Sequence, residues 1–323
     1  MVRVSQSLTG RSIAGLMMRR LATGLVAMSA MVMGPGVGAQ TAPAPGGALP
    51  AVSANLNINP KRITFDRLGK AAAVYVFNQG GAGGAFEVQM IDRIMLPNGQ
   101  IVPLAEATTK PEEKPVADKL KSAHEMVVTT PRRLNLSGNS GQTIRIRAGS
   151  AADVPPGEYR THLTVTAIPP ADIGLTAEQA ASQKEGQLSF RVNSVLGISI
   201  PVIIRVGPVD VRAAIEGAKI AFELVSSDGK SAPVRTAVLT FDLVRQGPNS
   251  LFGDVEVRGA KEKGDKDPMG AVRGVGVYPE IDKRAIKLAL NRIPVSGEQI
   301  EIAFRDDDTM PGKQLSRVIL TAP

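Results

Sequence analysis

The residue types on which enzyme chemistry most often depends are scarce in this sequence. Of 323 residues none is cysteine, and His124 and His162 are the only histidines. Zinc sites and nucleophile–histidine pairs draw on these residue types, so the sequence predicts neither. The alternation around His162 places it on the face opposite to Leu163 and Val165, and we expect it to face water or a polar neighbour.

Two other motifs suggest a ligand and fail on their spacing. The run Gly80–Gly84 differs from a dinucleotide fingerprint in spacing, and a strand-like segment follows it instead of a helix. It predicts a tight hairpin connection. The carboxylates Asp306–Asp308 could hold calcium, but they lack the spaced oxygen ligands of a loop site and favour a charged hairpin turn. We therefore predict no cofactor, no metal and no enzymatic activity.

The most informative chemistry belongs to the backbone of residues 188–203. Apolar side chains recur there at every second position, which is the pattern of a strand with one apolar face. That face carries Leu188, Phe190, Val192, Ser194, Leu196, Ile198, Ile200 and Val202. Such a strand would reach roughly 50 Å, well beyond the usual length. At a sheet edge it would offer unpaired backbone groups and an apolar row to another chain.

The apolar row could hold a partner or fill this protein's own core. Burying a large apolar side chain contributes about 1.5–3 kcal/mol, so five of them contribute roughly 8–15 kcal/mol. The costs of association and ordering are of similar size, which would permit both capture and release. Both interpretations stay open on sequence alone.

The first 39 residues have the pattern of a cleavable secretory signal. An apolar run from Leu21 to Met33 precedes the small residues Val37-Gly38-Ala39, and an uncleaved anchor is the alternative. Residues 40–53 form an Ala/Pro/Gly-rich lead-in, and no later segment is long and apolar enough to cross a membrane. The basic residues of the signal are Arg3, Arg11, Arg19 and Arg20.

The remaining charge does not predict nucleic-acid binding. Because four of the 38 basic residues lie in the signal, the net charge of +8 falls to +4 after its removal. Basic residues are scattered, and the chain has eight Phe, three Tyr and no Trp for stacking on bases.

Short alternating segments separated by glycine or proline predict an all-β protein. Residues 54–207 and 208–323 each hold enough strands for a β-sandwich, and the join lies near Arg205–Asp210. We predict an irregular surface loop at Glu106–Ala123. The strand-like segments are 55–65, 74–77, 86–95, 126–136, 142–147, 159–168, 219–225, 234–245, 254–258, 274–278, 285–290, 299–304 and 317–321.

Several motifs of the first domain resemble a known family. They are Asn59-Pro60-Lys61-Arg62-Ile63-Thr64-Phe65, Val74-Tyr75-Val76-Phe77-Asn78, Thr130-Pro131-Arg132-Arg133-Leu134, Gln142-Thr143-Ile144-Arg145-Ile146, Pro155-Pro156-Gly157-Glu158-Tyr159-Arg160 and Ala167-Ile168-Pro169-Pro170. Over about residues 52–207 the chain resembles the N-terminal domain of the periplasmic pilus-assembly chaperones, the PapD-like family. The second domain resembles this family only in position and predicted class.

The resemblance implies two immunoglobulin-like β-sandwiches in a boomerang arrangement with a cleft. It implies a non-enzymatic periplasmic chaperone that lends a long strand to pilin-like subunits and passes them to an outer-membrane usher. The lent side chains would be Leu188, Phe190, Val192, Leu196, Ile198 and Ile200. The alternative is a secreted two-sandwich adhesion or structural module without a client, and self-association through the free edge stays open.

The resemblance also assigns roles to charged residues. Arg62 aligns with an arginine that binds the subunit's terminal carboxylate, although a solvated arginine at a strand end is the alternative. The family's second anchor is a lysine, whereas this chain has Ser199 there and no lysine between Leu188 and Gly207. Glu158 and Arg205 match an interdomain ion pair. Its third member would come from Asp306, Asp307 or Asp308, and we favour Asp307.

Overall fold

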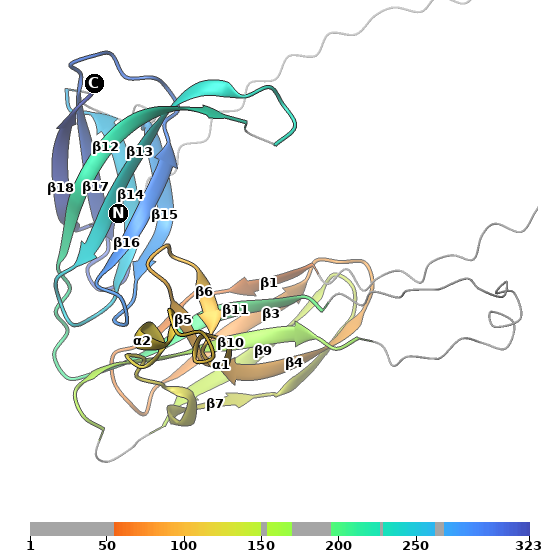
Figure 1. The fold of residues 1–323 in the computed structure, drawn as a ribbon. Helices are drawn as coiled ribbons and strands as arrows, with labels where there is room; N and C mark the ends of the chain where they lie inside the picture. The colour runs from red at the N-terminus through yellow and green to blue at the C-terminus, as the bar shows by residue number, and fades with distance from the viewer. Residues whose placement is uncertain (1–54, 150–153, 170–194, 227–228, 262–267) are drawn as a thin grey trace, which may run out of the picture. The chain divides into compact units, whose positions relative to one another are not determined.

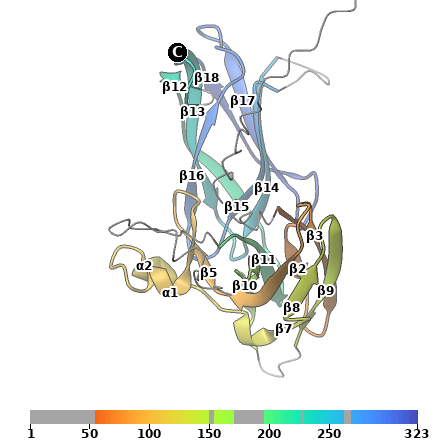
Figure 2. The same ribbon diagram turned by 90° about the vertical axis from the view of Figure 1, so that its right-hand side faces the viewer.

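The computed structural model describes residues 55–149, 154–169, 195–226, 229–261 and 268–323, all within one unit, Leu49–Pro323. The expected signal at 1–39, the lead-in at 40–53 and the side chains of Leu188, Phe190 and Val192 lie outside these residues. Figure 1 shows the strands that make up most of the described chain, and Figure 2 shows them from the side. No helix of the described part is long and apolar enough to cross a membrane.

The strands before residue 207 form a two-layer sandwich. One sheet has the order β1-β3-β9-β7 and the other has the order β2-β11-β10-β4-β8. Side chains such as Val74 and Ile144 from the first sheet meet Phe86 and Leu163 from the second in one apolar core. The strands are β1 (Leu56–Asn59), β2 (Ile63–Phe65), β3 (Ala71–Asn78), β4 (Gly84–Ile91), β7 (Val127–Thr130), β8 (Arg133–Leu136), β9 (Ser140–Ala148), β10 (Gly157–Ala167) and β11 (Gly197–Val206).

The strands after residue 212 form a second sandwich. Its sheets have the orders β12-β13-β16 and β15-β14-β17-β18. Leu239 and Phe241 from one sheet pack against Val255 and Ile302 from the other. The strands are β12 (Ala213–Val225), β13 (Val234–Arg245), β14 (Leu251–Gly259), β15 (Gly270–Val277), β16 (Lys283–Ala289), β17 (Gln299–Asp306) and β18 (Gln314–Thr321). The predicted all-β fold with two sandwiches is therefore confirmed.

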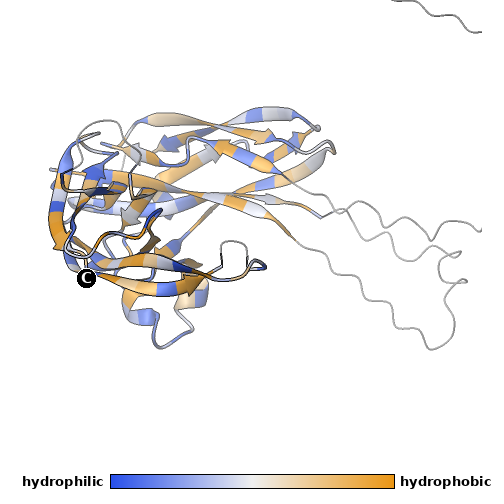
Figure 3. Cartoon of the chain, turned by 90° about the horizontal axis from the view of Figure 1, so that it is seen from above, coloured by the Kyte–Doolittle hydropathy of each residue, from blue (hydrophilic) through white to orange (hydrophobic). Residues whose placement is uncertain are grey.

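Period-two hydropathy explains these strands, because successive side chains point to opposite faces of a sheet. Figure 3 shows apolar and polar residues alternating along many of them. Two predicted segments are split by proline. Pro60 separates β1 from β2, and Pro131 separates β7 from β8, so each segment contributes to both sheets. Proline lacks the N–H that would continue a ladder.

Two sequence predictions about connections are wrong. The run Gly80–Gly84 joins β3 to β4, which lie in different sheets, so it is a crossing between layers rather than a hairpin turn. The stretch from Glu106 to Ala123 is not an irregular loop throughout, since Ala107 and Ala117 are buried. It is part of an insertion between β4 and β7 that contains β5 (Arg93–Met95), β6 (Ile101–Pro103), α1 (Leu104–Ala107), α2 (Lys114–Ala117) and the 3-10 helix η1 (His124–Met126).

Candidate functional site

Strand β11 is covered along one side and only partly along the other. It pairs with β10 over its whole length, from Val206 opposite Gly157 to Gly197 opposite Thr166. On the other side, β2 pairs in parallel with Val202–Ile204 alone. No described strand pairs with the outer side of Gly197–Pro201. This half of β11 is therefore an edge strand.

The direction of the backbone groups follows from antiparallel geometry. The Ala167 N–H donates to the Leu196 carbonyl at 2.9 Å. Hydrogen-bonded positions alternate along such a pair, so Gly197, Ser199 and Pro201 direct their backbone groups toward the outer side. Pro201 has no N–H, and this side is where a strand tolerates proline. Because β2 begins to pair at Val202, the uncovered edge presents the N–H and carbonyl groups of Gly197 and Ser199.

The candidate donated side chains differ in how far they are buried. Leu196 is 53% exposed, and its neighbour Val195 is exposed as well. Ile198 is partly buried against the first core. Ile200 is only 2% exposed and lies inside that core with Val202 and Ile204. Ile200 is therefore a core residue of this sandwich, which corrects its assignment to the donated row.

The opposite face of β11 carries a buried ion-pair network. Glu158 and Arg205 are ladder partners, and Arg205 Nε donates to Glu158 Oε2 at 3.0 Å. Arg205 Nη2 also donates to Asp308 Oδ2 at 2.7 Å. Asp308 rather than Asp307 is the third member, because β17 ends at Asp306 and the following turn leaves Asp307 exposed. The predicted charged turn between β17 and β18 is confirmed.

Arg62 belongs to the same network. Its Nη2 donates at 3.1 Å both to Asp308 Oδ2 and to Ser250 Oγ. Its guanidinium carbon lies 4.6 Å from the centre of the Phe252 ring, and its side chain is 8% exposed. The alternative of a solvated arginine is therefore wrong. Asp308 already supplies a carboxylate to this guanidinium, while Nε and Nη1 are buried without a partner in the described residues.

His162 is buried on this face, so of the two expected surroundings, water or a polar neighbour, water is wrong, and charged side chains such as Arg160 and Arg93 lie near it. Burial lowers its pKa well below the ordinary histidine value, and the charges of Arg160 and Arg93 act in the same direction. Arg160, two positions away, binds Glu280 and lies 3.7 Å from the centre of the Tyr278 ring. Sequence reasoning missed the Arg160–Glu280 pair. The signal was the alternation of Glu158, Arg160 and His162 on one face of β10.

Because of this ion-pair network, we expect the free energy of unfolding to fall as the pH becomes acidic. Burial alone would raise the pKa of Asp308, but Arg62 and Arg205 outweigh it and hold the pKa below its usual range. A carboxyl group with a depressed folded-state pKa stabilises the fold above its unfolded pKa, about 3.9, and this is lost as the pH falls through the folded value. We expect urea unfolding between pH 6 and pH 3 to show a smaller loss of stability for Asp308→Asn than for the wild type. Equal losses would contradict this assignment.

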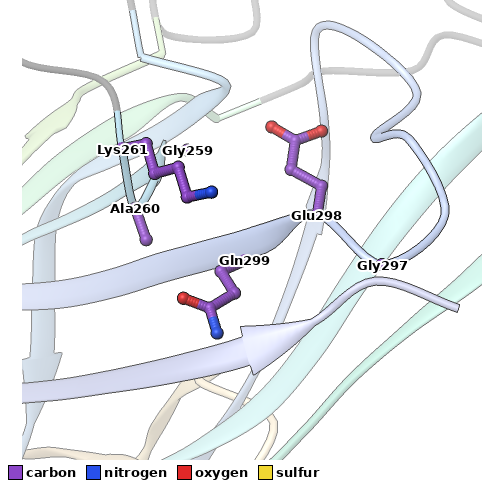
Figure 4. A pocket seen from close by; sticks show the side chains of 6 residues that line it. All are labelled: Gly259, Ala260, Lys261, Gly297, Glu298 and Gln299. Carbon is purple, nitrogen blue, oxygen red and sulfur yellow. The ribbon is translucent and has the colours of Figure 1, made fainter.

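A hollow in the second sandwich offers no acid–base pair. Gly259–Lys261 and Gly297–Gln299 line it (Figure 4). The hydrogen bond from Arg292 lowers the pKa of Glu298 to about 2, so this carboxylate is an anion at neutral pH rather than a general acid. Among the described residues, no group of three or more His, Cys, Asp or Glu side chains could hold a metal ion.

Comparison with known proteins shows a likeness at the level of structure alone. No family model and no curated protein matches the chain. The E. coli chaperone DraB is 12% identical over 83% of this chain and 96% of its own, with a TM-score of 0.39. The Pseudomonas aeruginosa CupB2 chaperone is also 12% identical, over 83% of this chain and 100% of its own, with a TM-score of 0.38.

A complex is among the similar structures. The Salmonella enterica structure of the SafA pilin with the SafB chaperone matches at 13% identity, over 82% of this chain and 95% of its own, with a TM-score of 0.38. At such identities and TM-scores these likenesses establish no function.

Proposed function

We propose that this protein is a non-enzymatic periplasmic chaperone. It binds pilin-like subunits by strand donation and delivers them to an outer-membrane usher. The observation that carries the proposal is the uncovered outer side of β11 at Gly197–Pro201. This edge continues into Val195 and Leu196, which are exposed. The resemblance of the first-domain motifs to the pilus-assembly chaperones supports the same function.

The chemistry of such an edge suits a family of related clients. Backbone hydrogen bonds along Gly197 and Ser199 would bind any extended strand, whatever its sequence. Specificity would come from alternate side chains, and the apolar alternation continues upstream through Leu188, Phe190 and Val192 in the sequence. Because Ile200 fills its own core, the donated row in this proposal ends at Ile198.

Substituting Leu196 tests this proposal. We expect Leu196→Asp to abolish the stoichiometric complex formed when the full chain is co-expressed with a small β-rich subunit encoded beside it. A charge in an apolar groove is unfavourable, whereas the exposed position of Leu196 leaves the free protein's melting temperature almost unchanged. The measurement is the yield of co-purified complex.

Val128→Asp is the matched control. Val128 is also an exposed apolar residue, at 58%, but it lies on β7 in the other sheet. This variant should retain the complex. A wild-type yield from Leu196→Asp, or equal losses from both variants, would contradict strand donation.

The burial of Ile200 favours one other function, a secreted two-sandwich adhesion or structural module that keeps this strand for itself. That protein would form no stoichiometric complex with any such subunit. Sedimentation of the purified chain would then show either a monomer or association through the free edge.

A further inference from the structure

The hairpin formed by β5 and β6 contributes to the core of the second sandwich. In sequence it interrupts the first sandwich, between β4 and β7. Met95 at the end of β5 is 4% exposed and belongs to the apolar cluster of β13, β14 and β17. Ile101 on β6 and Val116 on α2 pack against the same cluster. The second core therefore includes side chains from far outside residues 208–323.

Polar contacts fix the hairpin on the second sandwich. The Met95 N–H donates to Glu280 Oε1 at 2.8 Å, and the Ala285 N–H donates to the Pro97 carbonyl at 3.0 Å. At Gly99 the backbone has a φ of +86° and touches Arg284, so an added Cβ would meet its Nε at 2.3 Å. The turn of the hairpin thus favours a glycine for its conformation, and an added Cβ would also displace the Arg284 side chain.

A single buried carboxylate joins three parts of the chain. The Glu280 side chain is 1% exposed and accepts from both the Met95 N–H and the Arg160 guanidinium. Arg160 also donates to the Arg93 carbonyl at 2.9 Å. The strand beside β11, the hairpin and the second sandwich are therefore held by one group of hydrogen bonds. Removing one partner from such a buried group leaves the others unpaired.

The hairpin also has a small core of its own. Ile94 and Val102 pack there with Ala107 of α1 and Ala117 of α2. The short helices α1 and α2 therefore pack against the face of the hairpin opposite to Met95. This packing stabilises the hairpin, because an isolated two-stranded hairpin is only marginally stable.

We propose that residues 93–117 act as an internal brace. They belong to the first sandwich by chain connectivity, yet they complete the core of the second sandwich and contribute to its stability. The inference stands apart from the proposed function, because its test requires no client.

Hydrogen exchange of the full chain tests the brace. We expect Met95→Ala to raise amide exchange at least tenfold in β13 and β16 and to leave β3 and β9 unchanged. Met90→Ala is the matched control, because Met90 on β4 packs against the first core. That variant should raise exchange in β3 and β9 instead.

Gly99→Ala provides an independent variant if Met95→Ala does not fold. It strains the positive-φ turn and crowds Arg284, and we expect it to raise exchange in β16 more than in β9. Unchanged exchange in the second sandwich for these variants would overturn the brace, as would an equal increase in both sandwiches.

Discussion

Replacing Arg205 by alanine is expected to lower the free energy of unfolding by about 3–5 kcal/mol. The Glu158 side chain is 1% exposed, and Arg205 is its ion-pair partner. Removing the guanidinium leaves this carboxylate buried with only neutral donors, the Ser250 N–H at 3.1 Å among them. The loss thus exceeds the net strength of the pair itself, because a buried charge without its counter-ion is costly. Urea unfolding at neutral pH measures it.

Arg212→Ala is the matched control for this prediction. Arg212 also pairs with an aspartate, Asp210, but both side chains are largely exposed. Exposed pairs contribute about 0–1 kcal/mol. Losses of similar size for Arg205→Ala and Arg212→Ala would show that the buried network contributes no more to stability than an exposed ion pair.

Arg205 and Asp308 should also be coupled. Because the two side chains share a hydrogen bond of 2.7 Å, the double variant Arg205→Ala, Asp308→Asn should lose less stability than the two single variants together. Additive losses of stability would show that Asp308 is not energetically coupled to Arg205.

Local pattern predicted the strands well. The range predicted for β13 agrees with the structure at both ends, and the alternation of residues 188–203 contains the first part of β11. Such patterns work because a strand needs only a period of two and a boundary residue. Pro60 and Pro131 are visible in the sequence. The sheet that each flanking strand joins depends on its pairing with distant strands, which the local sequence does not reveal.

Contacts between distant residues could not be predicted in the same way. Asp306, Asp307 and Asp308 are chemically equivalent, and only the end of β17 and the direction of the next turn select Asp308. Arg160 and Glu280 lie 120 residues apart, and no sequence spacing connects them. Sequence reasoning missed the brace because its strands and helices are only three or four residues long, too short to show a period.

The second large effect is expected at Arg62. Its Nη2 has two hydrogen-bond partners, Asp308 and Ser250, and its guanidinium stacks on Phe252. Hydrogen bonds to charged groups contribute about 1.5–3 kcal/mol, so Arg62→Ala should lower the free energy of unfolding by about this amount. Lys61→Ala is the control, since Lys61 is exposed and bonds only to Asn57 within its own strand segment. It should leave stability unchanged.

Measuring stability and client capture on the same variant separates the two roles of Arg62. A carboxylate anchor alone predicts weaker capture at unchanged stability, whereas a structural cross-link predicts a loss of stability first. Arg62→Lys sharpens the distinction, because lysine keeps the charge but cannot present the guanidinium fork. We expect Arg62→Lys to recover only part of the lost stability. If Arg62→Ala kept full stability, the structural cross-link would be overturned, and binding of a client carboxylate would remain as the role of the Arg62 guanidinium.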